Sequence, residues 1–151
     1  MKQPSISEDV NLFRFRRRVE MRWSDLDEMR HVNNAVYLTY FEQGRLYYFL
    51  EAADWDWAGT GMIQARAEID YVRPLFLQNN PYLYIRTARL GRTSFEQHYL
   101  ILDEQPEGNR VIARGVTILV TFDYQQQQPM PLPPLARQRL LDYEKSNSVQ
   151  Q

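Results

Sequence analysis

Residues 23–53 have the sequence WSDLDEMRHVNNAVYLTYFEQGRLYYFLEAA, and no other stretch constrains the fold as strongly. The second part, 35–53, contains no proline, and its apolar side chains recur at helical spacing at Leu38, Phe41, Tyr48, Phe49 and Ala52. An apolar face this wide predicts a helix that is buried on more than one side. Asn33 or Asn34 is expected to cap its start. Gly44 indicates close packing against backbone, because glycine costs about 1 kcal/mol in a helix relative to alanine.

Five segments with strand-like patterns flank this helix. Residues 13–23 alternate between apolar and charged positions, with Arg17 as the one exception, which indicates a half-buried strand. Four more candidates follow the helix, at 62–72, 81–90, 94–103 and 110–123. The last is the longest and the most apolar, so we expect it to be central. A second helix is predicted at 135–144. The inventory predicts an α+β domain whose sheet wraps the long helix, because nothing else can bury that helix's apolar faces.

Length and composition indicate one folded domain. The chain has 151 residues, of which 44% are hydrophobic, and this is ample for a packed core. We place the domain at 13–144, with flexible segments at 1–12 and 145–151. No apolar run reaches the roughly 18 residues that a membrane span needs. The N-terminus also lacks the apolar centre of a signal peptide. These features predict a cytoplasmic protein that does not associate with membranes.

Charge and residue usage exclude several classes of protein. The 18 basic and 19 acidic residues give a net charge of −1, which argues against a nucleic-acid binder. The absence of cysteine excludes disulfides, thiolate metal sites and a cysteine nucleophile. With only two histidines, His31 and His98, a zinc site would need carboxylate ligands as well. We therefore expect neither a metal site nor a redox cofactor.

The loop before the long helix carries the candidate chemistry. Five polar residues crowd into it: Asp25, Asp27, His31, Asn33 and Asn34. Helix capping and turn formation account for such residues one at a time, and Asp25 is expected to hold the turn in this way. Together they also supply what acyl transfer needs. Free N–H groups at a helix start can hold an oxyanion, and a neighbouring carboxylate can act as base or nucleophile.

This loop resembles the signature of hotdog-fold thioesterases of the 4-hydroxybenzoyl-CoA thioesterase and YbgC type. It is also similar to the DLD…HVNN stretch of plant acyl-ACP thioesterases. The likeness covers roughly 16–140 and continues through YLTYFEQGR at 37–45, AEIDYVRPLF at 67–76, LGRTSFEQHYLI at 90–101, ARGVTILVTFD at 113–123 and PLPP at 131–134. The resemblance implies a hotdog fold, in which a curved antiparallel five-stranded sheet wraps one long central helix. It further implies a homodimer or homotetramer with active sites between subunits.

The resemblance also assigns roles to individual residues. Asp27 corresponds to the catalytic carboxylate, His31 would orient it or polarise the carbonyl, and the backbone N–H near Asn34 would receive the oxyanion. Arg92 and Ser94 match positions near the CoA nucleotide, and Arg89 could help to bind its phosphates. Tyr37 is expected either in the core or lining the acyl pocket, and it completes the set of substrate-binding candidates.

Two positions depart from the related families. Many YbgC-type members have glycine where this chain has Arg30, and a long cation there could change the entrance to the site. The plant enzymes have asparagine where this chain has Met29. A mechanism that needs that amide cannot operate here, which favours a simple scheme based on Asp27.

The expected activity is hydrolysis of a small to medium or aromatic acyl-CoA. An acyl carrier protein is the alternative carrier, because the arginines at 16–18 could dock an acidic protein. A non-catalytic hotdog protein that binds acyl groups is a second alternative. Glu42 is an alternative catalytic carboxylate, since a related hotdog clade places this group on the helix.

Overall fold

The computed structural model describes residues 7–145, so most of the two segments expected to be flexible lies outside the described residues. The elements in chain order are η1 (Val10–Leu12), β1 (Phe15–Arg18), η2 (Trp23–Asp25), α1 (Val36–Ala53), β2 (Gly61–Tyr71), β3 (Pro81–Leu90), β4 (Ser94–Gln105), β5 (Gly108–Asp123), β6 (Gln128–Pro129) and α2 (Pro134–Glu144). Here η denotes a short 3-10 helix. The long helix and the four strands after it match the predicted segments to within two residues at each end.

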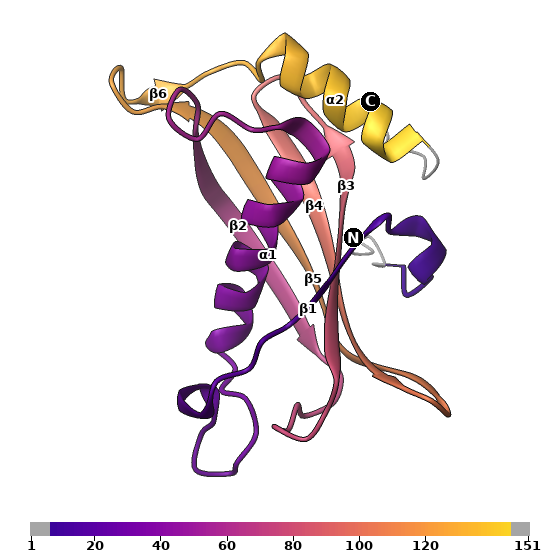
Figure 1. The fold of residues 1–151 in the computed structure, drawn as a ribbon. Helices are drawn as coiled ribbons and strands as arrows, with labels where there is room; N and C mark the ends of the chain where they lie inside the picture. Colours follow the sequence, from indigo (N-terminus) through magenta and orange to yellow (C-terminus); the bar gives the residue numbers. More distant parts are fainter. Residues whose placement is uncertain (1–6, 146–151) are drawn as a thin grey trace, which may run out of the picture.

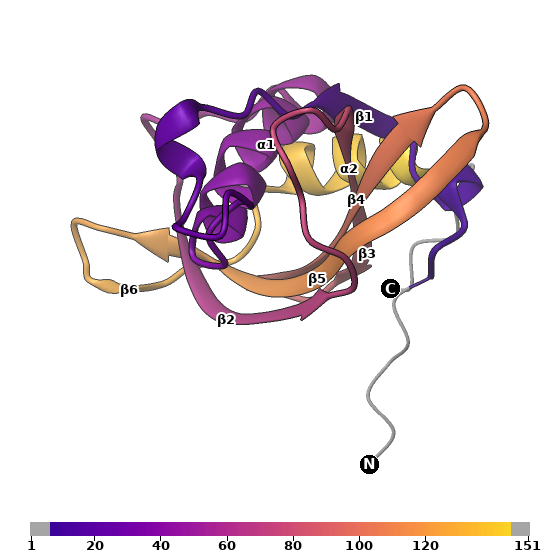
Figure 2. The same cartoon turned by 90° about the horizontal axis from the view of Figure 1, so that it is seen from below.

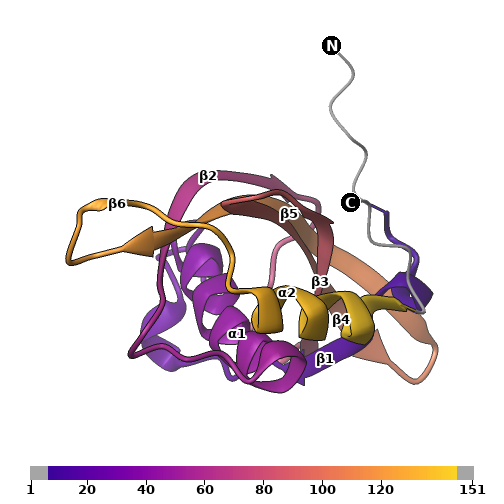
Figure 3. The same ribbon diagram turned by 90° about the horizontal axis from the view of Figure 1, so that it is seen from above.

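One antiparallel sheet curls around α1, with the strand order β1-β3-β4-β5-β2 and the short β6 added beside β5 (Figures 1 and 3). This is the α+β hotdog fold that the sequence predicts. The expectation that 110–123 is central is only partly right. β5 lies inside the sheet between β4 and β2, but β4 occupies the middle.

Irregular pairing helps the sheet to curl. The register shifts between Gln64 and Arg66 in β2, between Thr87 and Arg89 in β3, and at Ile112 in β5, on either side of which Ala113 and Val111 pair with Ile101 and Leu102. Such bulges add local twist and bend the strand that carries them. Their distribution over three of the strand pairs allows the sheet to wrap a single helix.

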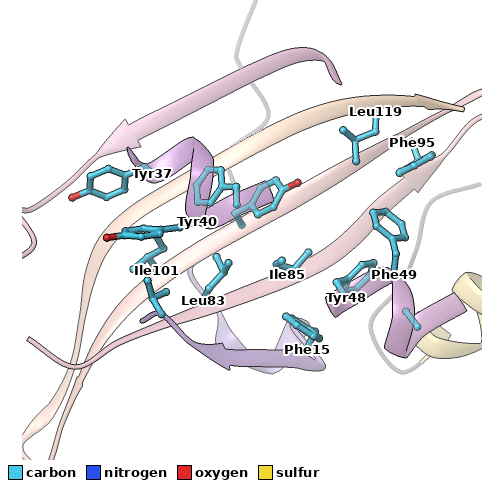
Figure 4. Close-up of a cluster of buried hydrophobic side chains, with 14 of the residues drawn as sticks. Phe15, Tyr37, Tyr40, Tyr48, Phe49, Leu83, Ile85, Phe95, Ile101 and Leu119 are labelled. Carbon is cyan, nitrogen blue, oxygen red and sulfur yellow. The ribbon is translucent and has the colours of Figure 1, made fainter. Parts of the chain in front are cut away.

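The core lies between α1 and the concave face of the sheet, and it is rich in aromatic rings (Figure 4). Phe41 of α1 stacks on Tyr99 of β4 with ring centroids 4.2 Å apart. A Cβ atom on Gly44 would clash with Leu83 and lie 2.9 Å from Ile85. Gly44 therefore lets α1 pack closely, as the sequence predicts, but against the side chains of β3 rather than against backbone.

The convex face of the sheet carries a second, smaller core. Its buried members are Phe13, Tyr84, Leu100 and Leu102, and side chains from η1 pack against them. The segment before Phe13, expected to be flexible, thus contributes its last residues to the folded domain.

The strand predicted at 13–23 is much shorter in the structure. β1 pairs with β3 only over Phe15–Arg18, and Val19 then donates one further backbone hydrogen bond to Pro81. After this point the Asp25 carboxylate accepts the backbone N–H and the guanidinium of Arg22. These bonds turn the chain into η2, which alternation of apolar residues along the sequence does not reveal.

Helix α2 covers the end of the sheet at which α1 terminates (Figure 3). Arg139 donates to the backbone oxygen of Ala53, the last residue of α1. Arg137 donates to the oxygen of Gly91, and Leu132, just before α2, donates to that of Arg92. The turn between β3 and β4 therefore lies at the C-terminal end of α1.

Candidate active site

The loop between η2 and α1 lies at the opposite end of the molecule, which Figure 2 views directly. An isolated bridge joins Leu26 to Val32 within the loop. Val32 N–H donates to Leu75 O at 2.8 Å, and a second bridge joins His31 to Phe76. The loop is thereby fixed against the connection between β2 and β3.

Asp27 and His31 face each other across this loop. Nδ1 of His31 lies 3.3 Å from Oδ2 of Asp27, and their side chains are 31% and 28% exposed, respectively. The other carboxylate oxygen accepts the N–H of Met29 at 2.9 Å, and Asp27 N–H donates to His31 O at 3.0 Å. The carboxylate is thus held in one orientation while part of it stays open to a ligand.

Arg30 occupies a strained backbone position in the same turn. Its φ is 63°, in the left-handed region, and its N–H donates to Asp27 O at 2.9 Å. Glycine adopts this conformation without a steric penalty, whereas other residues do not. The geometry therefore gives a physical reason for glycine at this position, which the resemblance to YbgC-type proteins implies.

Asp25 has a different environment from Asp27. It is 1% exposed, and it accepts hydrogen bonds from the Arg22 backbone, the Arg22 guanidinium and the Tyr40 hydroxyl, the last at 2.7 Å. Burial opposes its ionisation, but these hydrogen bonds and the Arg22 charge outweigh burial and lower the pKa of Asp25. This carboxylate holds the turn, as the sequence predicts.

The start of α1 presents a free backbone donor. Asn33 accepts the N–H of Ala35 on its side chain and the N–H of Val36 on its backbone oxygen, both at 2.9 Å. The N-cap is Ala35, without a side-chain cap, so the prediction that Asn33 or Asn34 caps the helix is wrong. The backbone oxygen of Asn34 accepts the hydroxyl of Tyr71, whereas its N–H donates to no residue within 7–145. An anion at this position would also meet the positive end of the helix dipole.

Tyr37 packs in the core. Its side chain is 2% exposed and meets the ring of Tyr71 edge-on, with centroids 5.0 Å apart. Burial, with a smaller contribution from Tyr71, raises the pKa of Tyr37 to about 12. Of the two places expected for Tyr37, the structure shows the core.

The other three residues assigned to substrate binding lie far from this loop within one chain. Arg89, Arg92 and Ser94 are at the turn between β3 and β4, beside α2. The 18-residue helix α1 separates the two ends, a length of about 27 Å at the usual rise per residue. One chain therefore groups Asp27, His31 and Asn34 but does not bring the nucleotide-binding candidates to them.

A groove of about 420 Å³ runs beside α1, on the side of β2. Its walls are formed by Thr39, Glu42, Gln43, Arg45, Leu46, Trp57, Met62, Gln64 and Leu119. Glu42 is two turns beyond Asn34, about 12 Å along the helix axis, and so it belongs to the groove rather than to the loop. Arg45 also lies on this wall, and nothing in the sequence had indicated that it faces a groove.

Within 7–145, no three His, Asp or Glu side chains gather in a way that could hold a metal ion. None of the helices in this part of the chain is long and apolar enough to cross a membrane.

Comparison with known proteins identifies the class. A family model for the thioesterase-like superfamily matches residues 21–140, and the chain belongs to this family. It is a hotdog-fold thioesterase, a hydrolase of thioester bonds, as the resemblance of its loop implies.

The chain is similar to a solved thioesterase, to a curated protein without an assigned function and, at lower identity, to a further structure of the same fold. A thioesterase from Thermus thermophilus, solved with coenzyme A and Zn, is 36% identical, with 88% of this chain and 96% of that chain covered and a TM-score of 0.75. The uncharacterized protein YsmA of Bacillus subtilis is 30% identical over 108 residues, which are 71% of this chain and 72% of YsmA. A mutant 4-hydroxybenzoyl-CoA thioesterase, solved with 4-hydroxybenzoyl-CoA, shares the fold at 15% identity, with 83% and 97% covered and a TM-score of 0.77.

Proposed function

We propose that this protein hydrolyses acyl-CoA thioesters with Asp27 as its catalytic carboxylate. The observation that carries the proposal is a partly exposed carboxylate in the loop that ends at a free helix-start N–H. The Thermus relative, which was solved with coenzyme A, supports CoA as the carrier.

In the proposed reaction, the bonds are made and broken by groups of the loop and by water. The thioester carbonyl oxygen accepts the N–H of Asn34, which stabilises the negative charge that develops in the transition state. Asp27 either attacks the carbonyl carbon or removes a proton from the water that attacks it. If water attacks, the carbon–sulfur bond then breaks, the thiolate of CoA takes up the proton, and the products are the free acid and CoA thiol. If Asp27 attacks, loss of the thiolate leaves an anhydride between the acyl group and Asp27, and water hydrolyses this anhydride to the free acid and the original carboxylate. His31, 3.3 Å from Asp27, positions the carboxylate.

A complete site requires a second copy of the chain in this proposal. β2 is an 11-residue strand at the edge of the sheet, and an exposed edge of this length is a template for pairing. One end of β2 lies at the loop, since the Tyr71 hydroxyl donates to Asn34 O. At the other end Gly61 pairs with Phe122, next to the point where β5 donates to Thr93 O. Antiparallel pairing of two β2 strands would bring the partner's nucleotide-binding turn to the loop, so we infer at least a homodimer.

The acyl carrier protein alternative has less support. Two of the three arginines that would dock an acidic carrier already contact groups of this domain. Arg16 pairs with Glu104 and lies 3.6 Å from the Tyr82 ring centroid, while Arg17 lies 3.4 Å from that of Tyr47. The accessible Asp27 carboxylate likewise weighs against a non-catalytic acyl-binding protein.

Thiol release from short, medium, long and aromatic acyl-CoAs tests the proposal. We expect hydrolysis by the natural sequence and loss of hydrolysis in Asp27→Asn, with the variant still folded by circular dichroism. Release only from an acyl carrier protein bearing the same acyl group would overturn the choice of carrier. Retained turnover in Asp27→Asn would overturn the role of Asp27.

A further inference from the structure

Arg45 lies on the wall of the groove between α1 and β2. Its Nη1 donates to Oε1 of Gln64 at 3.1 Å and to the hydroxyl of Tyr99 at 3.3 Å. Tyr99 is itself fully buried, stacked on Phe41 and hydrogen-bonded to Thr117 at 2.8 Å. These contacts hold the Tyr99 ring and hydroxyl, which gives the Arg45 guanidinium a defined position in the groove.

The rest of the Arg45 guanidinium has no partner in the described part of the chain. Within 7–145, Nε and Nη2 donate to no residue, and neither atom is buried. Glu42 lines the same groove one turn earlier, yet no ion pair between it and Arg45 forms among the described residues. The edge of the guanidinium that carries Nε and Nη2 is therefore open to a ligand.

The chemistry of this edge selects a carboxylate. Two parallel N–H groups match the two oxygens of a carboxylate, and a charged pair of this kind is about twice as strong as a neutral hydrogen bond. Gln64 and Tyr99 are neutral, so the positive charge of Arg45 is not compensated by either of its partners. A carboxylate on the ligand would provide that compensation.

We propose that the acyl group hydrolysed by this enzyme ends in a carboxylate that Arg45 binds, which makes the substrate the monothioester of a dicarboxylic acid. This inference rests on the proposed function, because it places the thioester carbonyl at Asn34. From Asn34 the acyl chain passes Thr39 and Glu42 on the groove wall to reach Arg45. Leu46, Trp57 and Met62 lie beyond Arg45, toward the C-terminal end of α1.

The helix sets the length of this acyl group. Arg45 follows Asn34 by three turns, about 16 Å along the axis. Helical side chains lean toward the N-terminus, which shortens the span to the guanidinium by several ångströms. An extended dicarboxylic acid of roughly eight carbons fits the remaining distance between the N–H of Asn34 and the Arg45 guanidinium.

Paired substrates of equal length test the inference. We expect kcat/KM to be at least about tenfold higher for suberyl-CoA than for octanoyl-CoA, since one charged hydrogen-bonded pair is gained. Arg45→Gln, which removes the charge and keeps a polar side chain, should bring this ratio to about one or below. Arg45→Lys keeps the charge without the two-pronged geometry, so it should give an intermediate ratio. Thermal unfolding of each variant confirms that it is folded.

The inference would be overturned if octanoyl-CoA were hydrolysed as well as suberyl-CoA or better, and if Arg45→Gln left the ratio of the two kcat/KM values unchanged. The proposed function would still stand. Absence of turnover with every acyl-CoA would overturn the proposed function instead. In that case, calorimetric binding of octanoate against octanamide, which has the same length but no carboxylate, still decides whether Arg45 makes the groove a carboxylate site. Equal binding of the two, unchanged in Arg45→Gln, would refute it.

Discussion

Asp25 and Asp27 lie two positions apart in one loop, and the structure gives them opposite environments. Asp25 is 1% exposed and bonded to Arg22 and Tyr40, whereas the Asp27 side chain is 28% exposed and faces His31. A buried carboxylate with several donors has no free oxygen for a substrate. A partly exposed carboxylate beside one histidine can be reached by a substrate and is held in a fixed orientation.

Matched substitutions should separate these two roles. Asp27→Asn should lower turnover by about a hundredfold to ten-thousandfold, the usual contribution of such a group. Its free energy of unfolding should change by less than about 1 kcal/mol, because asparagine keeps an oxygen that accepts the N–H of Met29. Asp25→Asn should instead lose about 2 kcal/mol of stability, because it weakens charged hydrogen bonds to a buried group. Thiol release and urea denaturation measure the two effects, and the reverse pattern would show that the roles are exchanged.

Arg30→Gly should stabilise the protein by about 1 kcal/mol. The substitution removes the steric penalty of a left-handed backbone at φ 63°, partly offset by the greater freedom of glycine in the unfolded chain. The midpoint of urea unfolding provides the measurement. Arg30→Ala serves as the control, since it removes the charge and keeps the strain. A gain in Arg30→Ala equal to that in Arg30→Gly would point to charge rather than backbone.

Glu144 should make stability depend on pH. It is fully buried, and its Oε1 accepts the hydroxyl of Tyr48 at 2.6 Å and the N–H of Thr87 at 3.0 Å. Burial raises the pKa of Glu144, and this effect exceeds the opposing effects of the two hydrogen bonds and of the charges on Arg86 and Arg14. The folded state therefore holds its proton to higher pH than the unfolded chain does.

The sign of the effect follows from linkage. The contribution of Glu144 to stability is full below the ordinary glutamate pKa of 4.5 and is lost as pH rises through the raised value. Glu144→Gln stays neutral and keeps an oxygen for Tyr48 and Thr87. Its stability relative to the natural sequence should accordingly increase from pH 4 to pH 7, by about 1.4 kcal/mol for each unit by which the pKa is raised. A constant difference across this range, measured by urea denaturation, would contradict the prediction.

Mixed dimers should show whether two chains build one site. In a dimer of one Asp27→Asn copy and one Arg92→Ala copy, one of the two proposed sites has both natural residues. We expect about half of the natural activity from the purified mixed dimer, and much less from either variant alone. If Asp27 and Arg92 of the same chain worked together, mixing would restore nothing. Differently tagged copies, expressed together, allow the mixed dimer to be isolated.

The sequence predicts those helices and strands whose own residues show a periodic apolar pattern. Apolar spacing predicts α1, and alternation between turn signals places β2 to β5 to within two residues. It fails for residues 19–23, where the bonds of Asp25 to Arg22 and Tyr40 end the strand. It also misses β6, because two residues are too few to give a periodic signal.

The candidate site is likewise predictable from the sequence only where its residues are close together in the chain. Asp27, His31 and Asn34 are close in sequence, and the loop keeps them together. Tyr37 is one helical turn away, and no local pattern shows that its ring points into the core. The open edge of Arg45 depends on Tyr99, more than fifty residues later in the chain, so only the folded sheet reveals it.

The length of α1 has a consequence for the enzyme at low concentration. The helix holds the two parts of the proposed site at opposite ends of each chain. A single subunit therefore has the loop with Asp27 but no nucleotide-binding turn beside that loop. Specific activity should then fall on dilution below the dissociation constant of the dimer and recover as subunits accumulate. The amount of protein in a cell would in this way act as a threshold for turnover, with no dedicated regulatory element.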